Sequence, residues 1–127
     1  MKKYALMMVV LVMGLSLAAG AFAADKDAIK MQVDEIVVAM DGGKTAADFK
    51  DAAKKEPYYV YILEEDGMVL VHPSLEGKSL KEAAMPAYEA VTKATPEGTW
   101  VMYEWKGAEK NAYVRKTKSG EIVGSGY

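Results

Sequence analysis

The strongest constraint on the fold comes from two short apolar runs, residues 59–63 and 68–71, which flank an Asp66-Gly67 dipeptide. Glycine accepts a positive φ angle and aspartate tolerates a left-handed geometry, so this pattern predicts a tight β-hairpin. Both runs are apolar or aromatic at successive positions, which is typical of strands covered on both faces. The sequence therefore predicts a sheet enclosed between two layers, with this hairpin as part of it.

The second run ends at His72-Pro73, which contains the single histidine of the chain. Proline lacks a backbone donor, so strand pairing is expected to stop there and to leave the imidazole at the rim of the sheet. Ligand sites tend to open at such rims. His72 is therefore a candidate to donate a hydrogen bond to a carboxylate, and the alternative is a structural imidazole satisfied by its neighbours.

The first 23 residues have the three parts of a secretory signal peptide. Lys2 and Lys3 form a basic start, residues 5–17 are apolar, and small residues lead to Ala23, after which we expect cleavage. The apolar run is shorter than the about 20 residues that span a membrane, and an uncleaved anchor is the alternative. We expect residues 24–127 to form a single domain in the periplasm.

Composition excludes several kinds of site. The absence of cysteine excludes disulfides, covalently attached c-type haem and thiolate zinc sites. Without Lys2 and Lys3, 14 Lys and Arg residues face 18 Asp and Glu residues, a net charge of about −4. This acidity, without a basic stripe, argues against nucleic acid as a partner. The overall field would repel an anionic ligand, so an anion site needs a local positive charge.

Periodicity and capping motifs predict two helices before the hairpin. Residues 25–40 repeat apolar positions at the spacing of an amphipathic helix, and the glycines at positions 42 and 43 end it. A capping box formed by Thr45 and Asp48 begins a short helix that continues to residue 55. The first helix is long enough to cover one face of a small sheet.

A second capping box, from Ser79 to Glu82, begins the segment that follows the hairpin. Pro86 is expected to interrupt this helix after Met85, because proline removes a helical donor, and helical structure resumes over residues 87–94. We expect this broken helix to form a lid or a pocket wall.

Three further strands are expected, over residues 99–105, 111–117 and 121–127, with a turn around Gly107. The chain then reads as a long helix, a short helix, two strands, a helical crossover and three strands. This order predicts an α+β fold, in which a five-stranded antiparallel sheet has the long N-terminal helix on one face and the crossover over the other.

Several short motifs occur in a characteristic order along residues 59–127. They are Tyr-Val-Tyr-Ile-Leu at 59–63, Asp66-Gly67, Val71-His72-Pro73, Gly77-Lys78, Tyr103-Glu104-Trp105, Lys110-Asn-Ala-Tyr113-Val114 and Gly124-Ser-Gly-Tyr127. With the preceding helix, this order resembles the single Cache domain of bacterial extracytoplasmic sensors, found in chemoreceptors and kinases. The resemblance implies a PAS-like fold that binds a small organic molecule, often a short carboxylate, on the sheet under the crossover segment.

Two departures from that family pattern bear on function. Members commonly continue into a transmembrane helix and a cytoplasmic module, whereas this chain stops at Tyr127. We therefore expect a stand-alone domain that passes its state to a membrane receptor or to a second protomer in a homodimer. The family often shows an Asp-x-x-Gly motif after the crossover helix begins, and here residues 84–88 read Ala-Met-Pro-Ala-Tyr. The ligand is therefore expected to be a small organic acid or related metabolite of open identity.

Lys110 begins the Lys-x-x-Tyr motif and is a candidate to hold an anion in this acidic protein. The alternative is a solvated turn lysine, since lysine is mostly exposed. Tyr113, in the same motif, shares strand parity with Arg115 and not with Lys110, so a regular strand cannot direct all three toward one wall. Lys110 would then reach in from the loop before the strand.

Aromatic residues are concentrated near these candidates and suit a pocket for a small ligand, although core packing is the alternative for each ring. Tyr61 and Tyr103 are preferred because tyrosine adds a polar tip to an apolar body. The predicted ligand-binding set is Tyr61, His72, Tyr103, Trp105, Lys110 and Tyr113.

No catalytic residue, metal ligand or cofactor is predicted. A lone histidine without a cysteine or a serine elbow lacks a nucleophile partner, so we expect the protein not to be an enzyme. The acidic residues 64–66 abut a tight turn and lack the spacing of a calcium loop. The rival to a sensory binding domain is an exported structural or protein-interaction module with a vestigial pocket.

Overall fold

The computed structural model describes residues 23–127, so the predicted signal peptide lies outside the described residues except for Ala23. In chain order the elements are α2 (Lys26–Asp41), η1 (Ala46–Lys54), β2 (Val60–Leu63), β3 (Val69–Val71), α3 (Leu80–Ala83), α4 (Met85–Val91), β4 (Thr99–Trp105), β5 (Ala108–Lys116) and β6 (Ile122–Gly126). Within this part of the chain, every helix is too short or too polar to cross a membrane.

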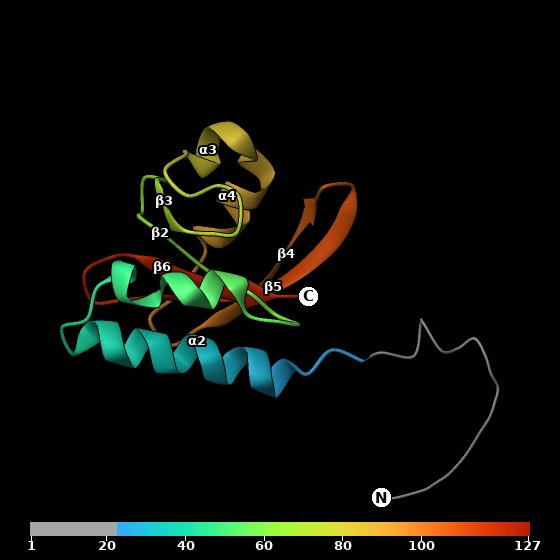
Figure 1. Ribbon diagram of the computed structural model, residues 1–127. Helices are drawn as coiled ribbons and strands as arrows, with labels where there is room; N and C mark the ends of the chain where they lie inside the picture. Colours follow the sequence, from blue (N-terminus) through green and yellow to red (C-terminus); the bar gives the residue numbers. More distant parts are fainter. Residues whose placement is uncertain (1–22) are drawn as a thin grey trace, which may run out of the picture.

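The strands form one five-stranded sheet in the order β3-β2-β6-β5-β4, and all neighbours are antiparallel (Figure 1). The last strand lies in the middle, where Val123 is opposite Ile62 on one side and Arg115 on the other. The two hairpins, β2–β3 and β4–β5, therefore occupy opposite edges. The predicted five-stranded antiparallel sheet is confirmed.

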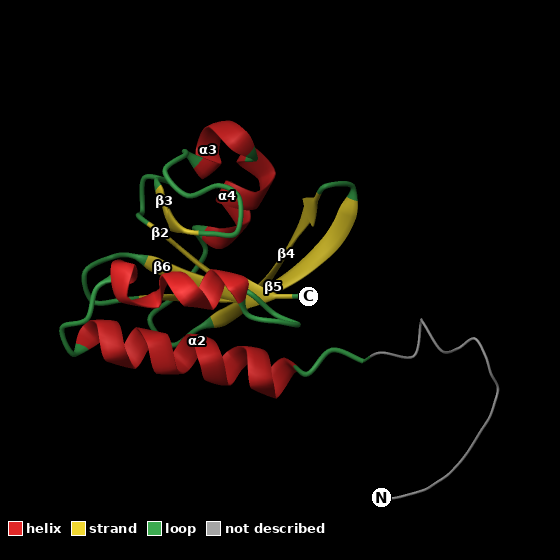
Figure 2. Cartoon of the chain, in the orientation of Figure 1, coloured by secondary structure: helices red, strands yellow, loops and turns green. Residues whose placement is uncertain are grey.

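Helical segments cover both faces of the sheet (Figure 2). One buried cluster lies between the sheet and α2 with η1, and a second lies between the sheet and α3 with α4. Successive side chains of β2 point to opposite faces of the sheet, so Val60 and Ile62 belong to the first cluster, and Tyr61 and Leu63 belong to the second. This arrangement confirms the prediction that the hairpin strands are buried on both faces.

Side-chain caps begin the first two helices, of which the one at Thr45 was predicted. Asp25 precedes α2, and its Oδ1 accepts a 3.0 Å hydrogen bond from the backbone N–H of Ala28. At the next helix, the Asp48 carboxylate accepts from the backbone N–H of Thr45 at 2.9 Å, as a capping box requires. This second helix is a 3₁₀ helix with Phe49 outside helical geometry, a detail that the capping motif does not specify.

The predicted position of the break in the crossover is wrong. The chain leaves helical geometry at Ala84 (φ −160°, ψ 80°), and Met85 already belongs to the second helix. Pro86 therefore lies in the first turn of α4, where a backbone N–H would have no hydrogen-bond partner within the helix, so its absence costs nothing. The proline begins α4, and it does not end α3.

The turn between β4 and β5 is tighter than the sequence indicates. Lys106 and Gly107 both have positive φ, at 52° and 82°, and Trp105 pairs with Ala108 across them. This is the geometry of a two-residue hairpin turn. The strand predicted to begin at residue 111 therefore begins at Ala108.

Candidate functional site

A small pocket lies between the sheet and the α3–α4 crossover. It is lined by Tyr59, Tyr61, His72, Leu80, Ala87, Val91, Tyr103 and Trp105. Its volume is about 20 Å³, enough for about one water molecule. The pocket therefore lies under the crossover, where the Cache resemblance places a ligand, but it is nearly closed.

Three parts of the sheet supply the pocket walls. Tyr61 lies in β2 and points to the same side as Leu63, opposite to the α2 side. Tyr103 and Trp105 lie on the inward face of β4, because alternate positions of that strand are partly buried and exposed. His72 follows the last residue of β3. The sequence thus brings residues from both sheet edges to one site.

Two backbone donors hold the imidazole of His72. Its Nδ1 accepts hydrogen bonds from the backbone N–H groups of Ser74 (2.9 Å) and Leu75 (3.1 Å), which assigns the ring proton to Nε2. Burial, and then the charges of Lys110 and Lys106, lower the pKa of His72 from 6.5 to about 4. At neutral pH the ring is therefore uncharged and presents an N–H donor.

The Nε2 atom has no hydrogen-bond partner among the described residues. It is also accessible to solvent, because no buried side-chain nitrogen or oxygen of this part of the chain lacks a partner. His72 therefore combines a fixed ring with an available donor.

Lys110 lies beside the same wall and carries an uncompensated charge. Its Nζ donates to Tyr59 Oη at 3.3 Å and lies 4.3 Å from the centroid of the Tyr59 ring. Within residues 23–127, no carboxylate pairs with Lys110; the ion pairs involve other cations. Burial lowers the pKa of Lys110, as expected for a partly desolvated ammonium group.

Two tyrosines complete the polar lining. The hydroxyl oxygens of Tyr61 and Tyr103 are 3.2 Å apart. Burial raises the pKa of Tyr61 well above its usual value, and burial raises the pKa of Tyr103 to about 12. Both hydroxyls are therefore protonated at neutral pH. Because only one proton lies between the two oxygens, the other is free to donate to a ligand.

The aromatic rings form a continuous wall from Tyr59 to Trp105. The His72 ring contacts both in edge-on geometry, with centroid distances of 5.5 Å to Tyr59 and 5.8 Å to Trp105. This wall depends on space behind Tyr61: a Cβ atom on Gly124 would lie 2.6 Å from that ring. The glycine in β6 therefore admits the Tyr61 ring.

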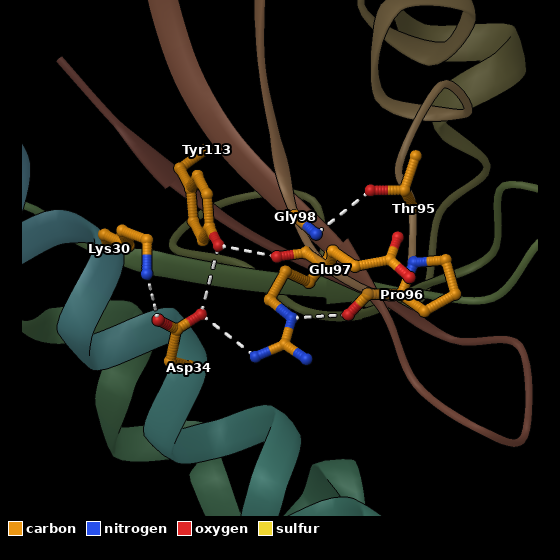
Figure 3. A network of polar contacts seen from close by, with 8 residues as sticks. Lys30, Asp34, Thr95, Pro96, Glu97, Gly98 and Tyr113 are labelled. Atoms are coloured by element: carbon orange, nitrogen blue, oxygen red, sulfur yellow. Dashed lines mark hydrogen bonds and ion pairs between the residues drawn. The ribbon is translucent and has the colours of Figure 1, made fainter.

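Tyr113 does not reach the pocket, so its predicted place in the ligand-binding set is inconsistent with the structure. It lies on the opposite face of the sheet, where its hydroxyl is 3.2 Å from Asp34 Oδ1 and 3.1 Å from the Glu97 carbonyl (Figure 3). Strand alternation is the reason, since Ala112 and Val114 face the pocket side. Tyr113 connects α2 to the turn before β4.

An open groove of about 950 Å³ borders the pocket and was not predicted. It runs between η1 and the loop after β3, and it shares Tyr59 and His72 with the pocket. Lys50, Lys54 and Lys55 contribute to its η1 side. The sequence carried no local signal for this groove, because only the fold brings η1 and the loop after β3 together.

The described residues contain no group of three His, Cys, Asp or Glu side chains that could hold a metal ion. The pocket lining also contains no aspartate or glutamate. Its polar groups are hydroxyls, an indole N–H, an imidazole N–H and the neighbouring ammonium group. Such a set favours a ligand that accepts hydrogen bonds and carries negative charge.

Comparisons with known proteins place the fold. No protein-family model matches the sequence, and no curated protein matches it. The structure is similar to a methyl-accepting chemotaxis protein from Vibrio parahaemolyticus, with a TM-score of 0.52 and 18% identity over 80% of this chain and 86% of that chain. It also resembles the ligand-binding domain of Mlp24 with asparagine, at a TM-score of 0.43 and 12% identity over 65% of this chain and 34% of that one.

The second likeness has too low a TM-score to support an inference. The first extends over most of both chains, and it matches the mixed helix and strand architecture with a five-stranded antiparallel sheet. The expected α+β fold with a five-stranded antiparallel sheet is therefore confirmed, and it is similar to the fold of the chemotaxis protein.

Proposed function

We propose that residues 24–127 form an exported sensory domain that binds a small organic anion, with short monocarboxylates as the first class to test. The observation that carries this proposal is the Lys110 ammonium, which donates to Tyr59 of the pocket lining and is close enough to His72 to lower its pKa, without a carboxylate partner in the described chain. A carboxylate would neutralise this charge and accept from the free donors.

The proposed roles follow from these contacts. Lys110 and the Nε2–H of His72 hold the carboxylate, and the paired hydroxyls of Tyr61 and Tyr103 supply a further donor. Trp105 and Tyr59 enclose the apolar part of the ligand. The small volume of the pocket favours ligands of a few non-hydrogen atoms, and it requires the pocket to widen on binding.

The acidity of the chain as a whole makes the local charge necessary. With a formal net charge of −2 for the full sequence, the protein does not attract anions generally. Affinity should therefore depend strongly on Lys110. The predictions of an extracytoplasmic location, a non-enzymatic role and a receptor or homodimer partner remain predictions.

Thermal unfolding with formate, acetate and propionate, each compared with sodium chloride at equal ionic strength, tests the proposal. At a hundred times its dissociation constant a ligand adds about 2.7 kcal/mol to stability, which raises the melting temperature by about 10 °C for a domain of this size. The matched variants are Lys110→Met and Lys44→Met. Stabilisation that Lys110→Met removes and Lys44→Met retains supports the proposal.

The rival function is an exported interaction module with a vestigial pocket. The nearly closed pocket favours it, as do Trp100 and Met102, which are 38% and 60% exposed on the outer face of β4. This rival is favoured if the melting temperature does not rise with any carboxylate, amino acid or amine at 10 mM, a concentration on the order of the weakest useful dissociation constants.

A further inference from the structure

The end of the β4–β5 hairpin extends beyond the rest of the sheet (Figure 1). β6 pairs with β5 from Lys116 to Ala112, and Tyr127 continues this pairing only to Asn111. Residues 103–110, which we call the β4–β5 arm, pair only with one another. An isolated two-stranded hairpin is marginally stable in water, so the arm depends on its contacts with the pocket.

The arm carries Tyr103, Trp105 and Lys110, which are half of the predicted ligand-binding set. Each contacts a different residue of the opposite wall, which consists of Tyr59, Tyr61 and His72. The contacts are Tyr103 Oη to Tyr61 Oη at 3.2 Å, the Trp105 and His72 rings at 5.8 Å between centroids, and Lys110 Nζ to Tyr59 Oη at 3.3 Å. The polar contacts of the pocket therefore bridge the arm and the wall.

The wall itself is held in place. Tyr61 pairs with Gly124 in the central strand of the sheet, and backbone donors fix the His72 ring. The α3–α4 crossover is also anchored, because Val91 is fully buried and Tyr88 Oη donates to the carbonyl of Glu65 at 2.9 Å. The arm, in contrast, pairs with no strand outside itself, and its remaining support is the packing of β4 against α4 and the wall.

We propose that the β4–β5 arm is the element that opens and closes this pocket, and that ligand occupancy sets its position. The inference rests on the proposed function, and it replaces the expectation that the broken helix is the lid. When the arm swings away, the three bridging contacts break and the pocket widens. A bound carboxylate then draws Lys110 and the arm back by bridging it to His72.

This arrangement links the ligand to a surface of the protein. Lys106 and Gly107 form the exposed tip of the arm, and the tip moves with the strands that carry Tyr103 and Lys110. Occupancy of the pocket thereby changes the position of a surface hairpin. That hairpin is the place where a receptor or a second protomer would detect the ligand.

Hydrogen exchange of the protein, read by NMR for each amide, tests the inference first without any ligand. Among the amides that are hydrogen-bonded between β4 and β5, those of residues 103–110 should exchange at least about ten-fold faster than those of residues 112–116, because their opening does not require global unfolding. Tyr61→Phe removes a bridging contact and should speed exchange of the arm about three-fold further. Tyr88→Phe, which removes a hydroxyl contact of the crossover, should leave the arm unchanged. Arm exchange as slow as that of residues 112–116, or opening of residues 80–91 instead, would overturn the inference.

Acetate is the probe for the second stage. If acetate stabilises the protein and slows exchange of residues 103–110 about ten-fold, the arm closes on the ligand. If acetate stabilises the protein but leaves exchange of the arm unchanged, the inference fails and the proposed function stands. If neither formate, acetate nor propionate binds, the proposed function fails, and with it the inference that ligand occupancy sets the position of the arm.

Discussion

The ammonium group of Lys110 lies 4.3 Å from the centroid of the Tyr59 ring and 3.3 Å from its hydroxyl oxygen. An aromatic wall that would otherwise suit a cationic ligand therefore already contains a cation from the chain itself. This relationship directs the site toward anions, and it makes Lys110 the residue on which ligand charge depends.

Replacing Lys110 by methionine should change which charge the pocket accepts. The substitution keeps an apolar stem and removes the charge. A hydrogen bond to a charged group contributes about 1.5–3 kcal/mol, so the acetate affinity should fall about 10- to 100-fold. Methylammonium, which the wild type should exclude, should gain affinity against Tyr59. Isothermal titration of both ligands measures this. Equal acetate affinity in Lys110→Met and Lys44→Met would remove Lys110 from the site.

His72 should make stability depend on pH in the mildly acidic range. Its folded-state pKa is lowered from 6.5 to about 4, so the unfolded chain binds the proton more readily and stability rises with pH between those values. The stabilisation is present above about pH 6.5 and is lost as the pH falls toward 4, and solvent screening limits it to about 1–2 kcal/mol.

Urea unfolding at pH 7, 5.5 and 4.5 measures this effect. His72→Asn is the control, because the amide oxygen can accept from the backbone donors at Ser74 and Leu75 but does not titrate. The difference in stability between wild type and variant should shrink as the pH falls. A difference that is constant over this range would contradict the assigned protonation of His72.

Gly124→Ala should displace the Tyr61 ring and lower the stability of the protein. The new Cβ would lie 2.6 Å from the Tyr61 ring, and overpacking of this kind costs about 1–3 kcal/mol. Gly42→Ala is the matched control, since its Cβ would meet only backbone oxygens at 3.5 Å. Chemical denaturation compares the two. Equal stability of both variants would mean that Tyr61 does not depend on the space at Gly124.

Tyr113→Phe should affect stability and leave ligand binding unchanged. The hydroxyl contacts Asp34 and the carbonyl of Glu97 on the α2 side of the sheet, and its loss should cost about 1 kcal/mol. Acetate affinity should stay within about two-fold of wild type, because mutations at distant sites change each other's effects by only a few tenths of a kcal/mol. A large loss of affinity at full folding would restore Tyr113 to the site and contradict its placement.

The two tryptophans provide a matched pair of reporters. Trp105 lies on the pocket side of the arm, whereas Trp100 lies on the other face against Tyr113 and Tyr127. In Trp100→Phe, acetate should reduce acrylamide quenching of the remaining indole. In Trp105→Phe, acetate should have no such effect. The reverse pattern would place the ligand on the α2 side.

Local patterns predicted much of the fold. The Asp66-Gly67 turn, the periodicity of α2 and the capping residues are properties of neighbouring positions, and the structure contains each of them. The turn around Gly107 was predicted, but the break at Ala84 and the two-residue length of the turn at Lys106 and Gly107 were not predictable in this way. Pro86 is compatible with either helix, and a lysine at positive φ carries no turn signal.

The site was predicted less completely because it depends on tertiary placement. Strand parity correctly separated Tyr113 from Lys110, but the motif resemblance grouped them. No local pattern showed that η1 would lie beside His72 and form the groove. Nor did the sequence indicate that the pocket would be nearly closed by contacts between the β4–β5 arm and the opposite wall.

A crystal structure of the protein with propionate, compared with a ligand-free crystal, tests the central claim most directly. We predict carboxylate density in the pocket, with one oxygen at about 2.8 Å from Lys110 Nζ and a second contact to His72 Nε2. Propionate bound elsewhere, or an empty pocket with Lys110 still on the Tyr59 ring at saturating propionate, would contradict the account.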